Sequence, residues 1–158
     1  MSSIALVHDI LAREAGEDVP FAEILRPLVQ MVSEGLVDPD RDVTFKLIGD
    51  AVLFVFDDPE PAARLALDLV ESFGGDQPEL RVGLTHGSVL SRLGDLFGPP
   101  VNLASRLVSY ARPGSVLVDQ LFLDRIGEVD DLRFRSIRPR DLKGIGTTAL
   151  YVLRRDER

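Results

Sequence analysis

The spacing of apolar positions switches along the chain between a helical period and a strand period. Apolar residues recur every three or four positions over residues 20–36, which predicts an amphipathic helix kinked at Pro27. Two apolar runs within 43–56 flank the pair Gly49–Asp50, which predicts a strand, a tight turn and a second strand. A further helix is predicted from Pro59 to Gly74, because proline favours the first helical turn and glycine the position after the last.

The remaining elements are predicted to be shorter. The alternating segment 80–84 and residues 89–90 suggest a second hairpin-like pair, and residues 95–100 are predicted to form a turn because Gly98, Pro99 and Pro100 break any period. Helices are expected over 101–110 and 120–126, and strands over 115–118, 134–137 and 149–153. Residues 4–7 fit either a buried strand or a helix that Ser3 caps.

This order of elements predicts an α+β fold. We expect a ferredoxin-like βαββαβ core, with a mostly antiparallel sheet and helices on one face. The 158 residues are enough for one domain, and no change of composition marks a boundary, so we predict a single domain over 1–158.

Charge and cysteine content narrow the function classes. The chain has 18 Lys and Arg against 26 Asp and Glu, and this net charge of −8 opposes non-specific attraction to nucleic acid or an anionic membrane. We therefore expect neither as a partner, and a polyanionic ligand would need metal ions or a local basic patch. The absence of cysteine excludes a disulfide, a zinc–thiolate site and a thiol nucleophile, and favours the cytoplasm as location.

Four polar residues are candidates for chemistry, because each lies at the edge of a predicted apolar element: Asp50, Asp95, Asn102 and Arg106. Lys46 lies four residues before Asp50 in the predicted hairpin. Asn102 and Arg106 are one helical turn apart and share a helix face. Taken singly, each residue also has an ordinary role: the aspartates as turn formers, Lys46 as a strand lysine facing solvent, Asn102 as a cap and Arg106 as a solvated arginine.

Four segments follow one another in a characteristic order: FKLIGDAVLFVF at 45–56, RVGLTHG at 81–87, DLFGPPVNLASR at 95–106 and LKGI at 142–145. Together they resemble the catalytic domain of class III adenylyl and guanylyl cyclases, well over residues 43–153 and weakly over 1–42. The short connection between Gly87 and Asp95 is similar to the short-arm subgroup common in actinobacterial proteins.

The resemblance implies conversion of ATP to cyclic AMP and pyrophosphate by a homodimer. It implies two divalent cations, Mg²⁺ or Mn²⁺, held by Asp9 at the end of the first strand and by Asp50 in the hairpin. The family's regulatory domain, which usually precedes the cyclase domain, is a candidate partner.

The resemblance also implies the nucleotide contacts. Lys46 and Asp95 match the residues that contact adenine, while Asn102 and Arg106 match those that orient the ribose and stabilise the transition state. Lys143 matches a lysine that meets phosphate oxygens. Hard carboxylate ligands for Mg²⁺ and a planar guanidinium for phosphate agree with this chemistry on physical grounds.

The first strand departs from the family pattern, because no Gly-Phe-Thr stretch follows Asp9. If residues 3–15 are helical, Asp9 is not a metal ligand. A second hypothesis is therefore a degenerate cyclase-like domain that binds nucleotide or a partner without turnover. Guanylyl cyclase activity is a third hypothesis, which the pair Lys46 and Asp95 disfavours.

Overall fold

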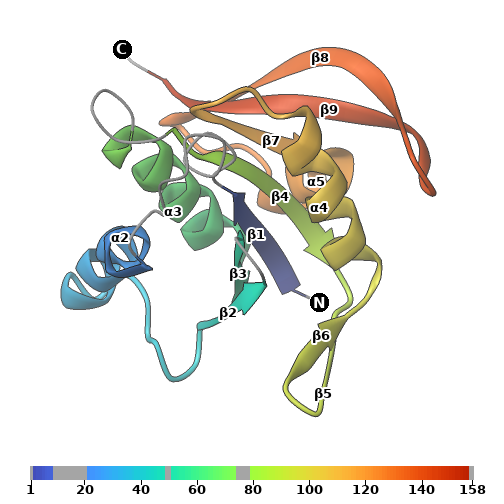
Figure 1. Cartoon of the computed structure of the whole chain (residues 1–158). Coiled ribbons are helices and arrows are strands. Elements are labelled where there is room, and N and C mark those ends of the chain that lie inside the picture. Colours follow the sequence, from blue (N-terminus) through green and yellow to red (C-terminus); the bar gives the residue numbers. More distant parts are fainter. Residues whose placement is uncertain (1, 9–20, 49–50, 74–78, 157–158) are drawn as a thin grey trace.

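The computed structural model describes residues 2–8, 21–48, 51–73 and 79–156, and its centre is one seven-stranded sheet (Figure 1). The strand order is β2-β3-β1-β4-β7-β9-β8. These strands are β1 (Ser2–His8), β2 (Val43–Ile48), β3 (Ala51–Phe56), β4 (Arg81–Gly87), β7 (Ser115–Asp119), β8 (Leu132–Leu142) and β9 (Gly146–Arg155). All neighbouring strands are antiparallel except β4 and β7, which are parallel.

The first segment is a strand, which decides between the two interpretations of residues 4–7. β1 lies inside the sheet and pairs antiparallel with β3 on one side and β4 on the other. Ile4 and Ala5 point to opposite faces and both are fully buried. A strand covered on both faces has a continuous apolar run in place of an alternating one, so its pattern also fitted a helix.

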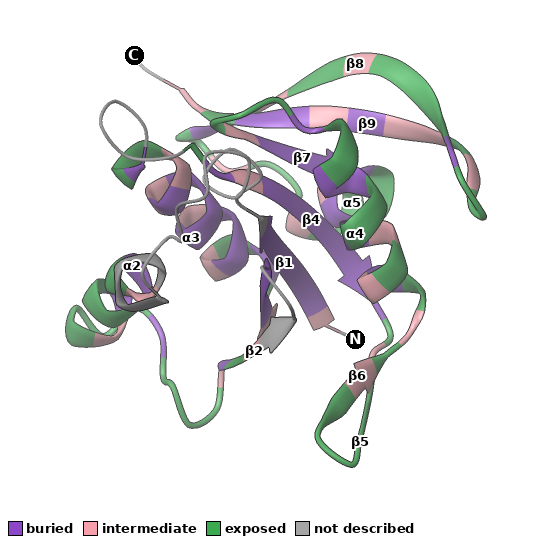
Figure 2. Ribbon diagram, viewed as in Figure 1, coloured by how far each residue is buried: buried purple, intermediate pink, exposed green. Residues whose placement is uncertain are grey.

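Helices cover both faces of the sheet, which corrects the expectation that they lie on one face. The helices are α2 (Phe21–Ser33), α3 (Pro59–Ser72), α4 (Pro99–Tyr110) and α5 (Gln120–Ile126). Ala5 and Val7 share a core cluster with α2, α3 and α5, whereas Ile4 and Leu6 pack against α4. The buried strands between these layers are visible in Figure 2. The spacing of apolar residues predicts which side of each helix is apolar. It does not predict which face of the sheet that side covers.

Two expectations about the segment before α4 are wrong. β4 pairs with β1 and β7, and not with residues 89–90. Residues 95–97, expected in a turn, form β6 (Asp95–Phe97), which pairs with β5 (Leu90–Arg92) in a separate two-stranded ribbon. The turn lies at Leu93–Gly94, where both φ angles are positive, +52° and +80°, as in a type I′ hairpin. The sequence Gly-Pro-Pro after β6 is a stronger turn signal than Leu-Gly, so the turn was predicted over 95–100 and not at Leu93–Gly94.

The other predicted elements are confirmed within a few residues. The hairpin over 43–56 and the helices near 59–72, 99–110 and 120–126 are present, and α2 contains Pro27. β8 and β9 extend beyond the predicted strands and form a long hairpin with an irregular register between Ile137 and Arg140. Within the described ranges, no helix combines the length and apolar character needed to cross a bilayer.

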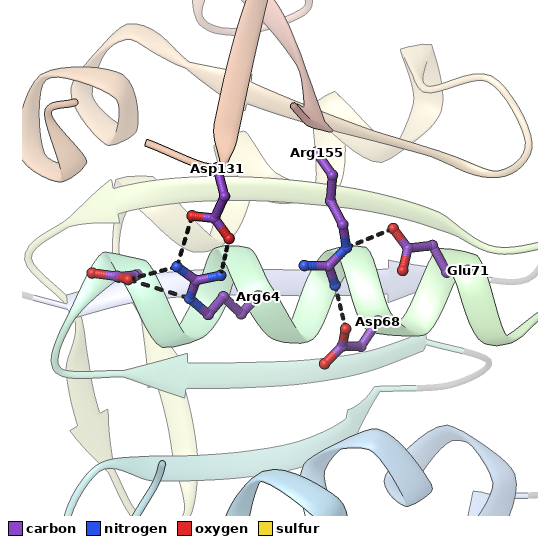
Figure 3. A network of polar contacts seen from close by, with 6 residues as sticks. Arg64, Asp68, Glu71, Asp131 and Arg155 are labelled. Atoms are coloured by element: carbon purple, nitrogen blue, oxygen red, sulfur yellow. Dashed lines mark hydrogen bonds and ion pairs between the residues drawn. The ribbon is translucent and has the colours of Figure 1, made fainter. Parts of the chain in front are cut away.

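Two arginines join α3 to the C-terminal strands (Figure 3). Arg64 makes a bidentate contact with Asp131, at 2.8 Å and 3.0 Å, and the pKa of that carboxyl is lowered mainly by this hydrogen bonding. Arg155 pairs with Asp68 and, at 2.7 Å, with Glu71. These contacts fix the end of the sheet against α3.

Candidate functional site

Lys46 and Asp95 are in contact although they are 49 residues apart in sequence. The Lys46 ammonium on β2 forms an ion pair with the Asp95 carboxylate at the start of β6, and donates a 2.8 Å hydrogen bond to the Gly94 carbonyl. The two side chains are 31% and 61% exposed, so a ligand can reach them. One N–H of the ammonium and part of the carboxylate stay available. The pair thus offers a donor beside an acceptor, and it complements a nucleobase edge that presents a hydrogen-bond acceptor beside an amino group.

Asn102 and Arg106 lie on the exposed side of α4. The opposite side of the helix is buried through Ala104, Leu107 and Val108, so packing directs the two polar side chains outward. The helix begins at Pro99, whose missing N–H costs nothing in the first turn. An amide and a guanidinium on one face can bind a hydroxyl and a phosphate group of the same ligand.

β4 holds α4 through alternate small or polar residues. A Cβ at Gly83 would lie 2.8 Å from the Ala104 carbonyl oxygen, and a Cβ at Gly87 would lie 2.6 Å from the Pro100 ring. Between them, the buried Thr85 hydroxyl donates a 2.9 Å hydrogen bond to the Pro100 carbonyl. This strand therefore sets the height of α4 above the sheet. From the sequence, residues 80–84 were used to predict a strand and residues 81–87 for the family resemblance, but the small residues at every second position, which signal a close approach, were not used.

Lys143 is exposed in the turn between β8 and β9. The neighbouring Leu142 is buried in one cluster with Leu107 of α4. The Tyr110 hydroxyl, at the end of α4, donates to the Asp141 carbonyl at 3.5 Å. The end of β8 that leads to Lys143 thus packs against the helix that carries Asn102 and Arg106.

The two predicted metal ligands, Asp9 and Asp50, lie outside the described residues. Their immediate neighbours are described: His8, before Asp9, is paired in register with Ala51, after Asp50, across β1 and β3. Within the part of the chain that the structure describes, no group of three or more His, Asp or Glu side chains could hold a metal ion.

Two buried titratable groups have partners within the fold. The Nδ1 atom of His86 lies 3.0 Å from the Ser3 hydroxyl, and burial lowers the pKa of His86. The Asp119 carboxylate accepts the Phe122 N–H at the start of α5, and burial raises the pKa of Asp119 to about 6. Both groups serve the fold, since their partners are strand and helix positions.

Comparison with known proteins identifies relatives. Residues 25–155 match the family described as the adenylate and guanylate cyclase catalytic domain. A pH-sensitive adenylate cyclase of Mycobacterium tuberculosis is 44% identical over 127 residues, and the match covers 73% of this chain and 32% of that protein. An adenylate cyclase of Streptomyces coelicolor is 51% identical over 83 residues, which are 51% of this chain and 22% of that protein. The chain thus spans a third or less of these curated relatives.

Solved structures share the fold. An adenylate cyclase of Trypanosoma brucei, analysed in its monomeric state, matches with a TM-score of 0.75 at 15% identity, over 96% of this chain and 88% of that chain. The catalytic core of a rhodopsin-guanylyl cyclase with converted specificity, in complex with ATPαS, matches with a TM-score of 0.72 at 24% identity. That match covers 98% of this chain and 96% of the other.

Proposed function

The chain belongs to the family of adenylate and guanylate cyclase catalytic domains, and from this premise we propose that it converts ATP to 3′,5′-cyclic AMP and pyrophosphate. The observation that carries the proposal is the contact between Lys46 and Asp95. Family resemblance assigns both residues to the adenine ring, and their contact across two separate sheets supports one composite base site. In this pair, Lys46 would donate to a ring nitrogen and Asp95 would accept from the exocyclic amine.

The reaction is an in-line displacement. The ribose 3′ hydroxyl loses its proton to solvent and its oxygen forms a bond to the α-phosphorus. The bond from that phosphorus to the oxygen bridging toward the β-phosphate breaks, and pyrophosphate leaves. Charge gathers on phosphoryl oxygens, so catalysis consists of positioning and electrostatic stabilisation. We assign ribose orientation to Asn102, stabilisation of the transition-state charge to Arg106 and a phosphate contact to Lys143.

Divalent cations are the expected cofactors of this family, and we propose two, Mg²⁺ or Mn²⁺, held by Asp9 and Asp50. The register of β1 and β3 supports this pair, since it joins the flanking residues His8 and Ala51 directly. Held by these carboxylates, such ions would activate the attacking hydroxyl and offset the negative charge of the leaving group. Residues 2–8 form a strand, and this supports the interpretation in which Asp9 follows the first strand.

We propose that the active unit is a homodimer. In the family, base contacts come from one protomer and metal ligands from the other, and two-fold symmetry then produces two equivalent sites. The β5–β6 ribbon supports an interface, because it exposes large apolar side chains: Leu90 at 59%, Leu93 at 96% and Phe97 at 52%. We also propose that β1, α2, β2, β3, α3 and β4 correspond to a ferredoxin-like core within one domain, which the strand order supports.

The test is cyclic AMP production by purified protein with ATP and Mn²⁺ over a range of protein concentrations. We expect specific activity to rise with concentration, and to be lost in Asp50→Ala and Arg106→Ala while circular dichroism stays unchanged. Mixing these two inactive variants should restore activity, because a heterodimer then contains one intact site. Binding of ATP with no turnover at any concentration would support the degenerate domain instead.

A further inference from the structure

The Lys46 ammonium has a second acceptor besides Asp95, the main-chain carbonyl of Gly94 at 2.8 Å. The lysine belongs to β2 of the large sheet, whereas Gly94 lies in the turn of the β5–β6 ribbon and Asp95 is the first residue of β6. Two acceptors fix the direction of an ammonium group far better than one, because two of its three N–H bonds are then oriented. The third N–H is left for a ligand.

The direction of the Gly94 carbonyl depends on a strained turn. Gly94 has a φ of +80° and Leu93 a φ of +52°, and Leu93 is the only non-glycine residue with a positive φ among those the structure describes. Leu93 is 96% exposed, so no packing explains its conformation. A Cβ at Gly94 would meet nothing within 4 Å, so glycine is not needed there for space either. The positive φ angles are those of a two-residue type I′ hairpin turn, and in this conformation the Gly94 carbonyl accepts a hydrogen bond from the Lys46 ammonium.

We propose that the Leu93–Gly94 turn determines base specificity by positioning Lys46 through the Gly94 carbonyl. This inference rests on the proposed function and deepens it: Gly94 touches no nucleotide atom and acts through the lysine. With both acceptors in place, the free N–H points to one position and meets a ring nitrogen of adenine. Without the carbonyl, the ammonium rotates about its bond to Asp95 and serves a carbonyl oxygen of guanine as well.

The matched variants are Gly94→Val and Gly94→Asn. Valine disfavours positive φ strongly, whereas asparagine tolerates the left-handed region. For Gly94→Val we expect kcat/KM for ATP relative to GTP to fall about tenfold, the equivalent of one lost hydrogen bond, chiefly through KM. For Gly94→Asn we expect the ratio to stay within about twofold of the wild type on the same basis. Equal ratios in the wild type and in a folded Gly94→Val variant would overturn the proposal.

A second readout does not depend on turnover. The chain contains two lysines, Lys46 and Lys143, so acetylation by limiting acetic anhydride can be followed at each by mass spectrometry, with the exposed Lys143 as internal reference. We expect Lys46 to react faster relative to Lys143 in Gly94→Val than in the wild type or Gly94→Asn. If the wild type makes no cyclic AMP, the proposed function fails, while the labelling ratio still tests the turn. An unchanged ratio in Gly94→Val would refute the positioning role.

Discussion

Alanine in place of Gly83 is expected to displace α4 and the two side chains it presents to the site. The added Cβ would lie 2.8 Å from the Ala104 carbonyl oxygen and 2.9 Å from the Leu107 Cβ. Both neighbours belong to the helix, one to its backbone and one to the first carbon of a side chain, so neither can rotate away. The strand cannot yield easily, because β4 is hydrogen-bonded on both sides.

The displacement can be worked out from these contacts. Ordinary contact begins near 3.4 Å, so relief of a 2.8 Å contact requires the helix to move by about 0.6 Å. Overpacking of this kind costs about 1–3 kcal/mol of unfolding free energy. A shift of about 1 Å in a positioning group can reduce the rate about 100-fold, so we expect cyclic AMP production to fall at least about tenfold.

Denaturant unfolding and the cyclase assay, both at a temperature where the variant is folded, measure the two effects. Gly127→Ala is the matched control, because it adds the same methyl group where nothing lies within 4 Å. Gly127 has a φ of +67° and a ψ of −153°, a region almost restricted to glycine, so alanine there should cost about 1–3 kcal/mol of stability, while α4 stays in place and activity is retained. A Gly83→Ala protein with wild-type activity and stability would refute the claim that β4 sets the position of α4.

Three further predictions concern the packing around the site and the buried charges. As pH rises from about 4 to 7, the free energy of unfolding of the wild type should fall by up to about 3 kcal/mol because of Asp119, and in Asp119→Asn this fall should be absent. The folded-state pKa of about 6 exceeds the ordinary 3.8, so the folded state retains a proton that the unfolded chain releases; equal pH dependence in both proteins would contradict this. Thr85→Val should cost about 1–3 kcal/mol in denaturant unfolding, because the buried Pro100 carbonyl loses its donor, whereas Thr85→Ser should cost less. Arg155→Met should cost about 1 kcal/mol or less, and the difference should shrink in high salt, since its two carboxylate partners on α3 are partly exposed; a salt-independent loss would point to packing instead.

The sequence by itself predicted most elements of this protein and the residues of its candidate site. Local signals were sufficient where the spacing of apolar residues agreed with the turn-forming and helix-starting residues, as in the hairpin over 43–56 and the helix that begins at Pro59. The family resemblance of four segments assigned roles to Lys46 and Asp95, and the structure brings this pair together. The roles of Asp9 and Asp50 remain predictions, because both residues lie outside the described part of the chain.

Only the tertiary structure decided what depends on the surroundings of an element. β1 is a strand because β3 and β4 flank it and both its faces are covered, a condition that leaves no alternation in the sequence. α4 covers the face opposite α3 because alternate residues of the strands are apolar on both sides, and a helical period does not specify which side a helix will cover. The link from Lys46 to Gly94 joins residues 48 apart through a backbone carbonyl, which no side-chain pattern records.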